Sequence, residues 1–266
     1  MQRRACVDHA VKVHGVSAAR ACRIFNFNRT NLYYEKLMPA KDQKVKELIE
    51  VNLGRGNCGR NTVTASIRRK RPDVGSYKIR RVYVQQGFSL QKRLKKRRIK
   101  NPPNPISIPL TSNQEWAMDF MSDALTNGRK FRTFNVIDQY NRECLGIRVA
   151  FSIPAKRVVL ELDRIIEKYG KPAAIRTDNG PEFTSKVFQN WLHERKICWS
   201  PIEKGKPQQN GIIERFNRTV REAVLDACLF PTLQDAQNEC DTFITEYNEV
   251  RPHQALNYKT PKEYAA

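Results

Sequence analysis

Three acidic residues stand out by their positions in this chain of 266 residues. Asp119 lies within an apolar, strand-like stretch, Asp178 directly follows the short stretch AAIRT, and Glu214 lies in a long helical stretch. Carboxylate oxygens without cysteine or histidine favour Mg²⁺ or Mn²⁺ over zinc. Two such ions, roughly 4 Å apart, suit in-line attack on a phosphodiester by water or by the 3′ hydroxyl of DNA. The residue types therefore predict a metal-dependent phosphoryl transfer that needs no protein nucleophile.

Each acid also has an ordinary structural interpretation. Asp119 could pair with a lysine at a strand edge, Asp178-Asn179-Gly180 could be a common turn, and Glu214 could pair with Arg218 one helical turn away. The joint placement favours the metal site over these alternatives. Other acids compete for the same role, and Asp123 is the strongest competitor because it shares a strand face with Asp119. The remaining competitors are Asp138, Glu182 and Glu203.

The residues from 113 onward must position these acids. Their pattern predicts three strands, a helix, a strand, a helix, a strand and then two long helices. The expected ranges are 115–124, 130–140, 144–151, 154–170, 173–177, 185–196, 197–201, 207–229 and 232–249. This order predicts an α/β fold with a ribonuclease-H-like mixed sheet covered by helices. In such a sheet the first and fourth strands are neighbours, so Asp119 and Asp178 approach each other, and the first long helix brings Glu214 to them.

Basic residues are concentrated in the front of the chain. The net charge is +21, and residues 1–110 hold 26 Lys/Arg against 6 Asp/Glu, whereas residues 111–266 hold 22 against 21. This asymmetry predicts that the front part binds a polyanion, most simply nucleic acid. A basic surface that is merely solvated is the alternative.

The front part is expected to be entirely helical. Helices over 3–14, 17–25 and 29–37 predict a helix-turn-helix, with Arg29, Thr30 and Asn31 at the start of the recognition helix. A small helical bundle with a basic solvated face is the other interpretation. Helices over 41–53, 61–70 and 76–86 predict a second such unit, capped at Ser76 and carrying the candidate DNA-binding residues Arg80 and Arg81.

A basic run and a proline-rich stretch follow. Seven of the nine residues from Lys92 to Lys100 are Lys or Arg, and Lys95, Lys96, Arg97 and Arg98 are candidates to follow DNA phosphates. A solvated linker is compatible with that role. Prolines then exclude a regular helix and mark a domain boundary. The predicted division is 1–40, 41–100, 101–112 (linker) and 113–266 (catalytic core).

The sequence has no stretch of eighteen uncharged apolar residues, so no membrane span is expected. The N-terminus lacks the apolar segment of a signal peptide. Seven scattered cysteines without a CxxC pair fit a reducing compartment. We therefore expect a cytoplasmic, nucleoid-associated bacterial protein.

Four motifs together carry a family resemblance: WAMDFMSDALTNGRKFRTFNVIDQYNRECLGI, RTDNGPEF, QQNGIIERFNRTVRE and YNEVRPHQALNYKTPKEY. They resemble the DDE transposases of IS3-family insertion sequences, in particular the second-frame protein, whose core is similar to retroviral integrases. The resemblance implies that Asp119, Asp178 and Glu214 bind two Mg²⁺ or Mn²⁺ ions. It also implies that Arg221, seven residues after the glutamate, holds a DNA phosphate or terminal base, although a helix surface charge would look the same.

The resemblance further implies a reaction and partners. The protein would cleave the element's ends and join the 3′ hydroxyl to target DNA, as a homo-oligomer on DNA. The upstream-frame protein of the same element, as a fusion or in a complex, would be a further partner. Two alternatives stay open: a non-catalytic DNA-binding regulator of the element, and a ribonuclease-H-like nuclease that does not join strands.

Overall fold

The computed structural model describes residues 2–33, 38–53, 58–89, 109–203 and 207–265. The chain divides into two units, Met1–Glu47 and Leu48–Ala266. The boundary between them falls inside helix α4 (Met38–Leu53). The finer division at residues 40, 100 and 112 remains a prediction.

The N-terminal unit begins with three helices, α1 (Gln2–His14), α2 (Ala18–Ile24) and α3 (Arg29–Leu32). Val7, Ala21, Cys22 and Leu32 form their small core. The third helix was predicted to extend over 29–37, but α3 ends at Leu32 with Tyr33 as its C-cap, and residues 34–37 lie outside the described part. The described part of the predicted recognition helix is therefore a single turn.

Two further helices, α5 (Arg60–Lys70) and α6 (Ser76–Gln85), pack as a pair. Their inner faces bury Val63 and Ile67 of α5 and Ile79 and Val82 of α6. The N-cap of α6 is Gly75, so the predicted cap at Ser76 is one residue late. Gly87, which was expected to end this helix, has a φ of +78°, a left-handed conformation that glycine adopts without strain.

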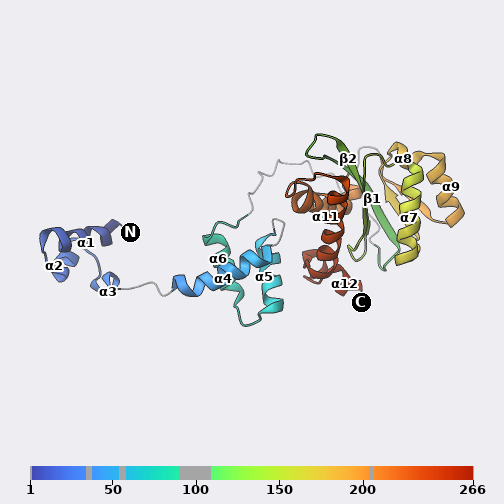
Figure 1. Ribbon diagram of the computed structural model, residues 1–266. Coiled ribbons are helices and arrows are strands. Elements are labelled where there is room, and N and C mark those ends of the chain that lie inside the picture. Colours follow the sequence, from blue (N-terminus) through green and yellow to red (C-terminus); the bar gives the residue numbers. More distant parts are fainter. Residues whose placement is uncertain (1, 34–37, 54–57, 90–108, 204–206, 266) are drawn as a thin grey trace. The chain divides into compact units, whose positions relative to one another are not determined.

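A five-stranded mixed sheet forms the centre of the C-terminal part (Figure 1). Its strands are β1 (Glu115–Ala124), β2 (Lys130–Asp138), β3 (Cys144–Ala150), β4 (Ala174–Thr177) and β5 (Cys198–Pro201). Their order is β3-β2-β1-β4-β5. The first three strands pair antiparallel, while β4 runs parallel to β1 and to β5. The predicted mixed sheet, with its first and fourth strands adjacent, is confirmed.

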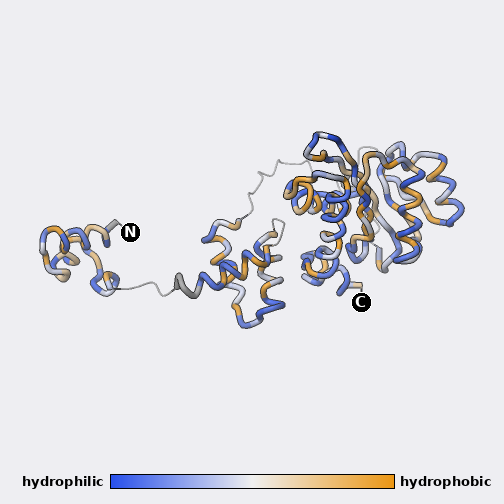
Figure 2. Tube along the Cα trace, viewed as in Figure 1, coloured by the Kyte–Doolittle hydropathy of each residue, from blue (hydrophilic) through white to orange (hydrophobic). Residues whose placement is uncertain are grey.

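Alternation along β1 places apolar side chains on both faces of the sheet. Trp116 and Met118 pack with α7 (Ala155–Tyr169), α8 (Pro181–Thr184) and α9 (Lys186–Arg195). Ala117 faces α10 (Gly211–Val220) and α11 (Leu233–Thr245) on the other side. Figure 1 shows α7 and α11 on opposite sides of the strands, and Figure 2 shows hydrophobic residues recurring along these elements. The core is thus two apolar layers with the sheet between them.

The two long C-terminal helices are shorter than predicted. The stretch 207–229 comprises a 3₁₀ turn η1 (Pro207–Asn210), α10, and a π-helical segment η2 (Arg221–Leu225). The stretch 232–249 comprises α11 and a second π-helical segment, η3 (Glu246–Val250). A 3₁₀ turn η4 (Gln254–Leu256) and helix α12 (Pro261–Ala265) follow.

Candidate active site

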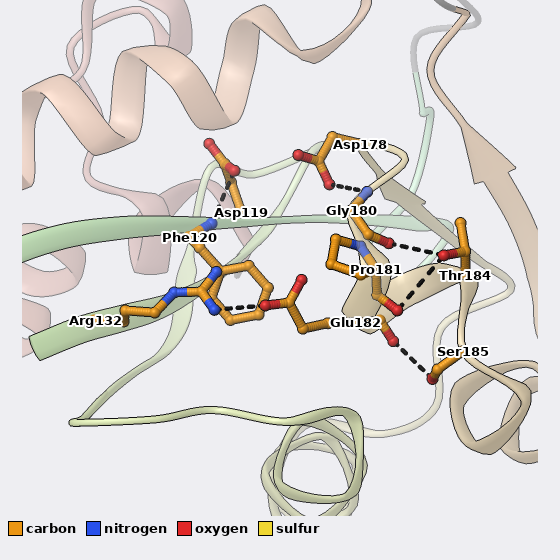
Figure 3. A network of polar contacts seen from close by, with 9 residues as sticks. All are labelled: Asp119, Phe120, Arg132, Asp178, Gly180, Pro181, Glu182, Thr184 and Ser185. Carbon is orange, nitrogen blue, oxygen red and sulfur yellow. Dashed lines mark hydrogen bonds and ion pairs between the residues drawn. The ribbon is translucent and has the colours of Figure 1, made fainter.

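Asp119 and Asp178 come from adjacent parallel strands. Asp119 lies in the middle of β1, and Asp178 is the first residue after β4, which pairs with β1. Figure 3 shows both carboxylates projecting to the same side of the strands. That side is the one covered by α10, because Asn217 of α10 bonds to Asp119. The sheet topology thus brings together two acids that lie far apart in sequence.

A tight turn holds Asp178 at the end of β4. The N–H of Gly180 donates to Asp178 Oδ1 at 3.0 Å, and the side-chain amide of Asn179 donates to the carbonyl of Ile202 at 2.9 Å. A Cβ at position 180 would lie 3.0 Å from that same Oδ1, so glycine leaves room for the carboxylate. The predicted turn is present, and it positions the acid rather than competing with a functional role.

Glu214 lies in the first turn of α10 and is exposed, while Ile213, Phe216 and Val220 anchor the helix to the sheet. The negative charge of Glu214 reaches Asp119. The pKa of Asp119 is raised to about 6, chiefly by burial and also by the charges of Asp178 and Glu214, against hydrogen bonds from Phe120 and Asn217 that lower it. The three acids therefore share one electrostatic environment.

None of the ion pairs within the described part of the chain includes Asp119, Asp178 or Glu214. The proposed pairing of Glu214 with Arg218 and of Asp119 with a lysine is accordingly not found among these residues. Carboxylates that lie near one another destabilise one another unless a positive charge compensates them.

The competing acids have other partners. Asp123 pairs with Arg221 at 3.2 Å, and Asp138 accepts backbone N–H groups from Asn113 and Tyr140 at 2.7 and 2.8 Å. Glu182 pairs with Arg132, and Figure 3 shows this pair on the side of the strands away from Asp119. Glu203 bonds to Gln209. These contacts separate the competitors from the three candidate site acids.

The donor set consists only of carboxylate oxygens, which suits a hard divalent cation. Within the described residues, however, no three His, Cys, Asp or Glu side chains lie close enough together to form a ready metal site. The acids are near enough to affect one another's charge, and their chemistry fits Mg²⁺ or Mn²⁺, but their side chains are not arranged as a finished ligand cluster.

Two asparagines contribute to this site without having been predicted. Asn217 Nδ2 donates to Asp119 Oδ2 at 2.7 Å, and Asn135 Nδ2 donates to Asn217 Oδ1 at 2.7 Å. Considering only charged residues overlooks them. The available signal was the spacing of Asn217, three residues after Glu214 on a helix, which places both side chains on neighbouring surface positions.

Family models match most of the C-terminal part. An integrase core domain model matches residues 109–207, and a second model described as an integrase core domain matches residues 195–261. The 31.7 kDa protein of insertion element IS407 from Burkholderia multivorans is 34% identical over 253 residues, which cover 94% of this chain and 91% of that protein. The chain belongs to the integrase-core family of insertion-element transposases.

A further relative agrees with this assignment, and a solved structure shares the fold. The transposase of insertion sequence element IS904 from Lactococcus lactis is 28% identical over 167 residues, covering 60% of this chain and 64% of that protein. A chain in the cryo-EM structure of a simian T-cell lymphotropic virus intasome with the PP2A regulatory subunit B56 gamma has a TM-score of 0.55 at 16% identity. That match covers 78% of this chain and 70% of the other, and it shows a shared fold. The protein is a DNA transposase of the polynucleotidyl transferase type, and its family depends on divalent metal ions.

The predicted DNA-binding residues of this transposase occupy different settings. Arg29, Thr30 and Asn31 are exposed on α3, where the Asn28 side chain accepts the N–H of Thr30 at 3.0 Å. Arg80 is exposed on α6 and Arg81 is half-buried. The four basic-run candidates Lys95, Lys96, Arg97 and Arg98 lie outside the described residues.

Arg221 is held by the end of β1. Its guanidinium donates to Ser122 O at 2.7 Å and to Asp123 Oδ2 at 3.2 Å. These contacts lie within the protein, and the contact of Arg221 with a DNA phosphate or terminal base stays a prediction. Across the described helices of the transposase, none has the length and apolar character needed to span a membrane.

Proposed function

We propose that this transposase cleaves one strand at each end of its insertion element and joins the resulting 3′ hydroxyl to target DNA. Asp119, Asp178 and Glu214 would hold two divalent ions for this reaction. The observation that carries the proposal is that these three acids share one electrostatic environment without a basic partner among the described residues.

The protein's own residues have distinct tasks in this scheme. Asp119 is fixed on a central strand, and Asp178 is fixed by its turn with Gly180. Glu214 is exposed on α10 and can close the site when DNA and metal bind. The ions, when bound, would activate the attacking hydroxyl and stabilise the leaving oxygen. The rigid pair and the exposed third ligand together suit a site that is completed on its substrate.

DNA would be gathered by the front of the chain. Exposed Arg29 on α3 and Arg80 on α6 are suited to phosphate contacts, which give affinity independently of sequence. We further propose that the element belongs to the IS3 family and that the transposase acts as a homo-oligomer on DNA in the bacterial cytoplasm, with the upstream-frame protein as a partner.

A strand-joining assay with Asp178→Asn tests the proposal. Using Mg²⁺ and DNA carrying the element ends, we expect cleavage and joining to be lost while DNA binding is retained. The matched control is Glu167→Gln, an exposed carboxylate on α7, which should behave like the wild type. Full cleavage by Asp178→Asn would contradict the assignment.

The same assay separates the alternative functions. A non-catalytic regulator would bind DNA without nicking it in Mg²⁺ or Mn²⁺. A nuclease would cleave but never yield a product that covalently links donor and target DNA. Only a transposase gives that joined product.

A further inference from the structure

An uncharged side chain of α10, Asn217, makes a hydrogen bond to the candidate metal ligand Asp119. Asn217 Nδ2 donates to Asp119 Oδ2 at 2.7 Å, and Asn217 Oδ1 accepts from Asn135 Nδ2 at 2.7 Å. Both amides are buried, with exposed fractions of 0% for Asn135 and 8% for Asn217. The two bonds form a series, Asn135–Asn217–Asp119, that links β2, α10 and β1.

The sheet register explains why these three side chains meet. Asn135 lies directly opposite Asp119 in the antiparallel pairing of β2 with β1. Residues opposite each other in such a pair project from the same face of the sheet. Helix α10 crosses that face, and Asn217 reaches both side chains from it. Asn217 lies one helical turn after Glu214 on α10. Its bond to Asp119 therefore also helps to fix the position of Glu214 relative to β1.

Both hydrogen bonds in the series donate toward Asp119, from Asn135 to Asn217 and from Asn217 to Asp119. An ionised carboxylate can only accept hydrogen bonds, so the amide nitrogen of Asn217 must face Asp119. The amide oxygen of Asn217 then faces away and needs a donor, which Asn135 supplies. A flipped Asn217 would place its oxygen against the carboxylate, and the bond from Asn135 disfavours that orientation.

Asn135 is a poor choice for stability alone. Its Oδ1 is buried and has no hydrogen-bond partner within the described residues. A buried polar atom without a partner costs free energy that an apolar side chain of similar size would not. The position is therefore explained better by its contact with Asn217 than by its contribution to the core.

We propose that Asn217 is a positioning residue for the transposase reaction, holding Asp119 in the orientation that binds metal, and that Asn135 fixes Asn217 in turn. This inference rests on the proposed metal site. It predicts that uncharged residues outside the ligand set determine how tightly the site binds a divalent ion.

Calorimetric measurement of Mn²⁺ binding to the full, DNA-free chain tests the inference. The variants are Asn217→Ala and Asn217→Leu, the second of which keeps the number of side-chain heavy atoms and limits the cavity. We expect Mn²⁺ affinity about 10- to 100-fold weaker, as for other groups that orient metal ligands. The Mg²⁺ concentration for half-maximal strand joining should rise by a similar factor, with a smaller effect on the rate at saturating Mg²⁺.

The matched control is Asn190→Ala, an exposed asparagine on α9, which should bind Mn²⁺ like the wild type. A folded Asn217→Leu variant with wild-type Mn²⁺ affinity would overturn the inference, because a purely structural role changes the melting temperature and leaves affinity unchanged. Asp119→Asn serves as the reference. If it also keeps wild-type affinity, the metal site itself fails; if it loses affinity while the Asn217 variants do not, only the positioning role fails.

The order of the series is tested by a double-mutant cycle. Asn135→Ala alone should weaken Mn²⁺ binding by a smaller factor than Asn217→Ala. The double variant should bind no more weakly than Asn217→Ala, since Asn135 acts only through Asn217. Independent, multiplying losses would contradict the series. If the Asn217 variants do not fold, unchanged Mn²⁺ affinity in Asn135→Ala contradicts it equally.

Discussion

The two ends of strand β1 differ from its middle. Glu115, Asp119 and Asp123 are spaced four residues apart, so all three project from the face that α10 covers. At the start of the strand, Glu115 pairs with Arg176 of β4, and at the end Asp123 pairs with Arg221. Among the described residues, Asp119 receives hydrogen bonds only from neutral groups, the Phe120 N–H and the Asn217 amide.

This difference distinguishes Asp119, as a candidate to bind a cation, from the two acids that already pair with arginines. Arginines neutralise the outer two acids, whereas the pKa of the middle acid is raised by burial and by two further carboxylates nearby. A positive charge for the middle position must come from outside the described side chains. The side chain that contacts Asp119 from α10 is the neutral Asn217, whereas Glu115 and Asp123 each contact an arginine.

Asp119→Asn should give the largest effect. Strand joining should fall at least about 1,000-fold, because a lost metal ligand removes several kcal/mol of transition-state stabilisation. Without metal, the same variant should be more stable than the wild type above pH 6 by about 1 kcal/mol or more, since it removes a charge that burial disfavours. Joining assays and denaturant unfolding in EDTA check both parts. A variant that is less active and also less stable would indicate a purely structural role.

Glu115→Gln should lower the stability of the protein, whereas Asp119→Asn should raise it in the absence of metal. Glu115 and Arg176 form a bidentate ion pair, in which Arg176 Nη2 lies 2.9 Å from Glu115 Oε2 and Arg176 Nε lies 3.2 Å from Glu115 Oε1. Their side chains are only 9% and 8% exposed. Removing the charge of Glu115 leaves a buried arginine uncompensated, which should lower the free energy of unfolding by about 3 kcal/mol. Urea unfolding measures this loss. Glu249→Gln is the control, because its pair with Lys262 is 48% and 68% exposed and should contribute under about 0.5 kcal/mol.

His253 offers a third case, a buried basic group that is neutral in the fold. Burial, and then the charge of Arg251, lower the pKa of His253 to about 4, and its ring contacts Tyr247 at 4.6 Å between centroids. Its folded pKa lies below the unfolded value of 6.5, so its contribution is fully present above pH 6.5 and is lost as pH falls toward 4. Between those pH values the wild type should lose about 2 kcal/mol more stability than His253→Asn. Parallel pH profiles of the two proteins would contradict this.

The pair at the far end of β1 should give the smallest effect. Arg221 and Asp123 are 37% and 24% exposed, so breaking their pair should cost only about 0.5 kcal/mol. If Arg221 contacts DNA, Arg221→Ala should weaken DNA binding a few-fold and reduce the salt dependence of binding by about one ion. Asp123→Asn removes this ion pair, although Arg221 keeps its hydrogen bond to the Ser122 carbonyl and lies 3.7 Å from Asp226. This variant should bind DNA at least as well as the wild type. Equal DNA binding by all three proteins would make the role of Arg221 structural.

The strands and the order of the sheet could be predicted because alternation is a strong local signal. The predicted strand over 115–124 matches β1 at both ends. The predicted helix over 207–229 failed at both ends for a physical reason. Ile213, Phe216, Val220, Ala223 and Val224 keep an apolar helical spacing through the π-helical segment, so periodicity cannot reveal the change in hydrogen bonding.

The site was only partly accessible from sequence. Candidate acids can be found by their type and position, and the sheet order then brings Asp119 and Asp178 together. The partners that distinguish them from Asp123 and Glu182 are arginines more than 40 residues away in sequence, and these contacts exist only once the chain is folded. Asn135 was missed for the same reason, since its importance comes from facing Asp119 across two strands.

The most direct test of the central claim is thermal unfolding of the DNA-free protein with and without Mn²⁺. Ligand at 100 times its dissociation constant stabilises a folded protein by about 2.7 kcal/mol. We predict that Mn²⁺ raises the melting temperature of the wild type and of Glu167→Gln, and that it has no such effect on Asp119→Asn. An equal rise in all three proteins, or none in the wild type, would contradict the proposal that Asp119 and the neighbouring acids, which have no ion pair among the described residues, form the metal site.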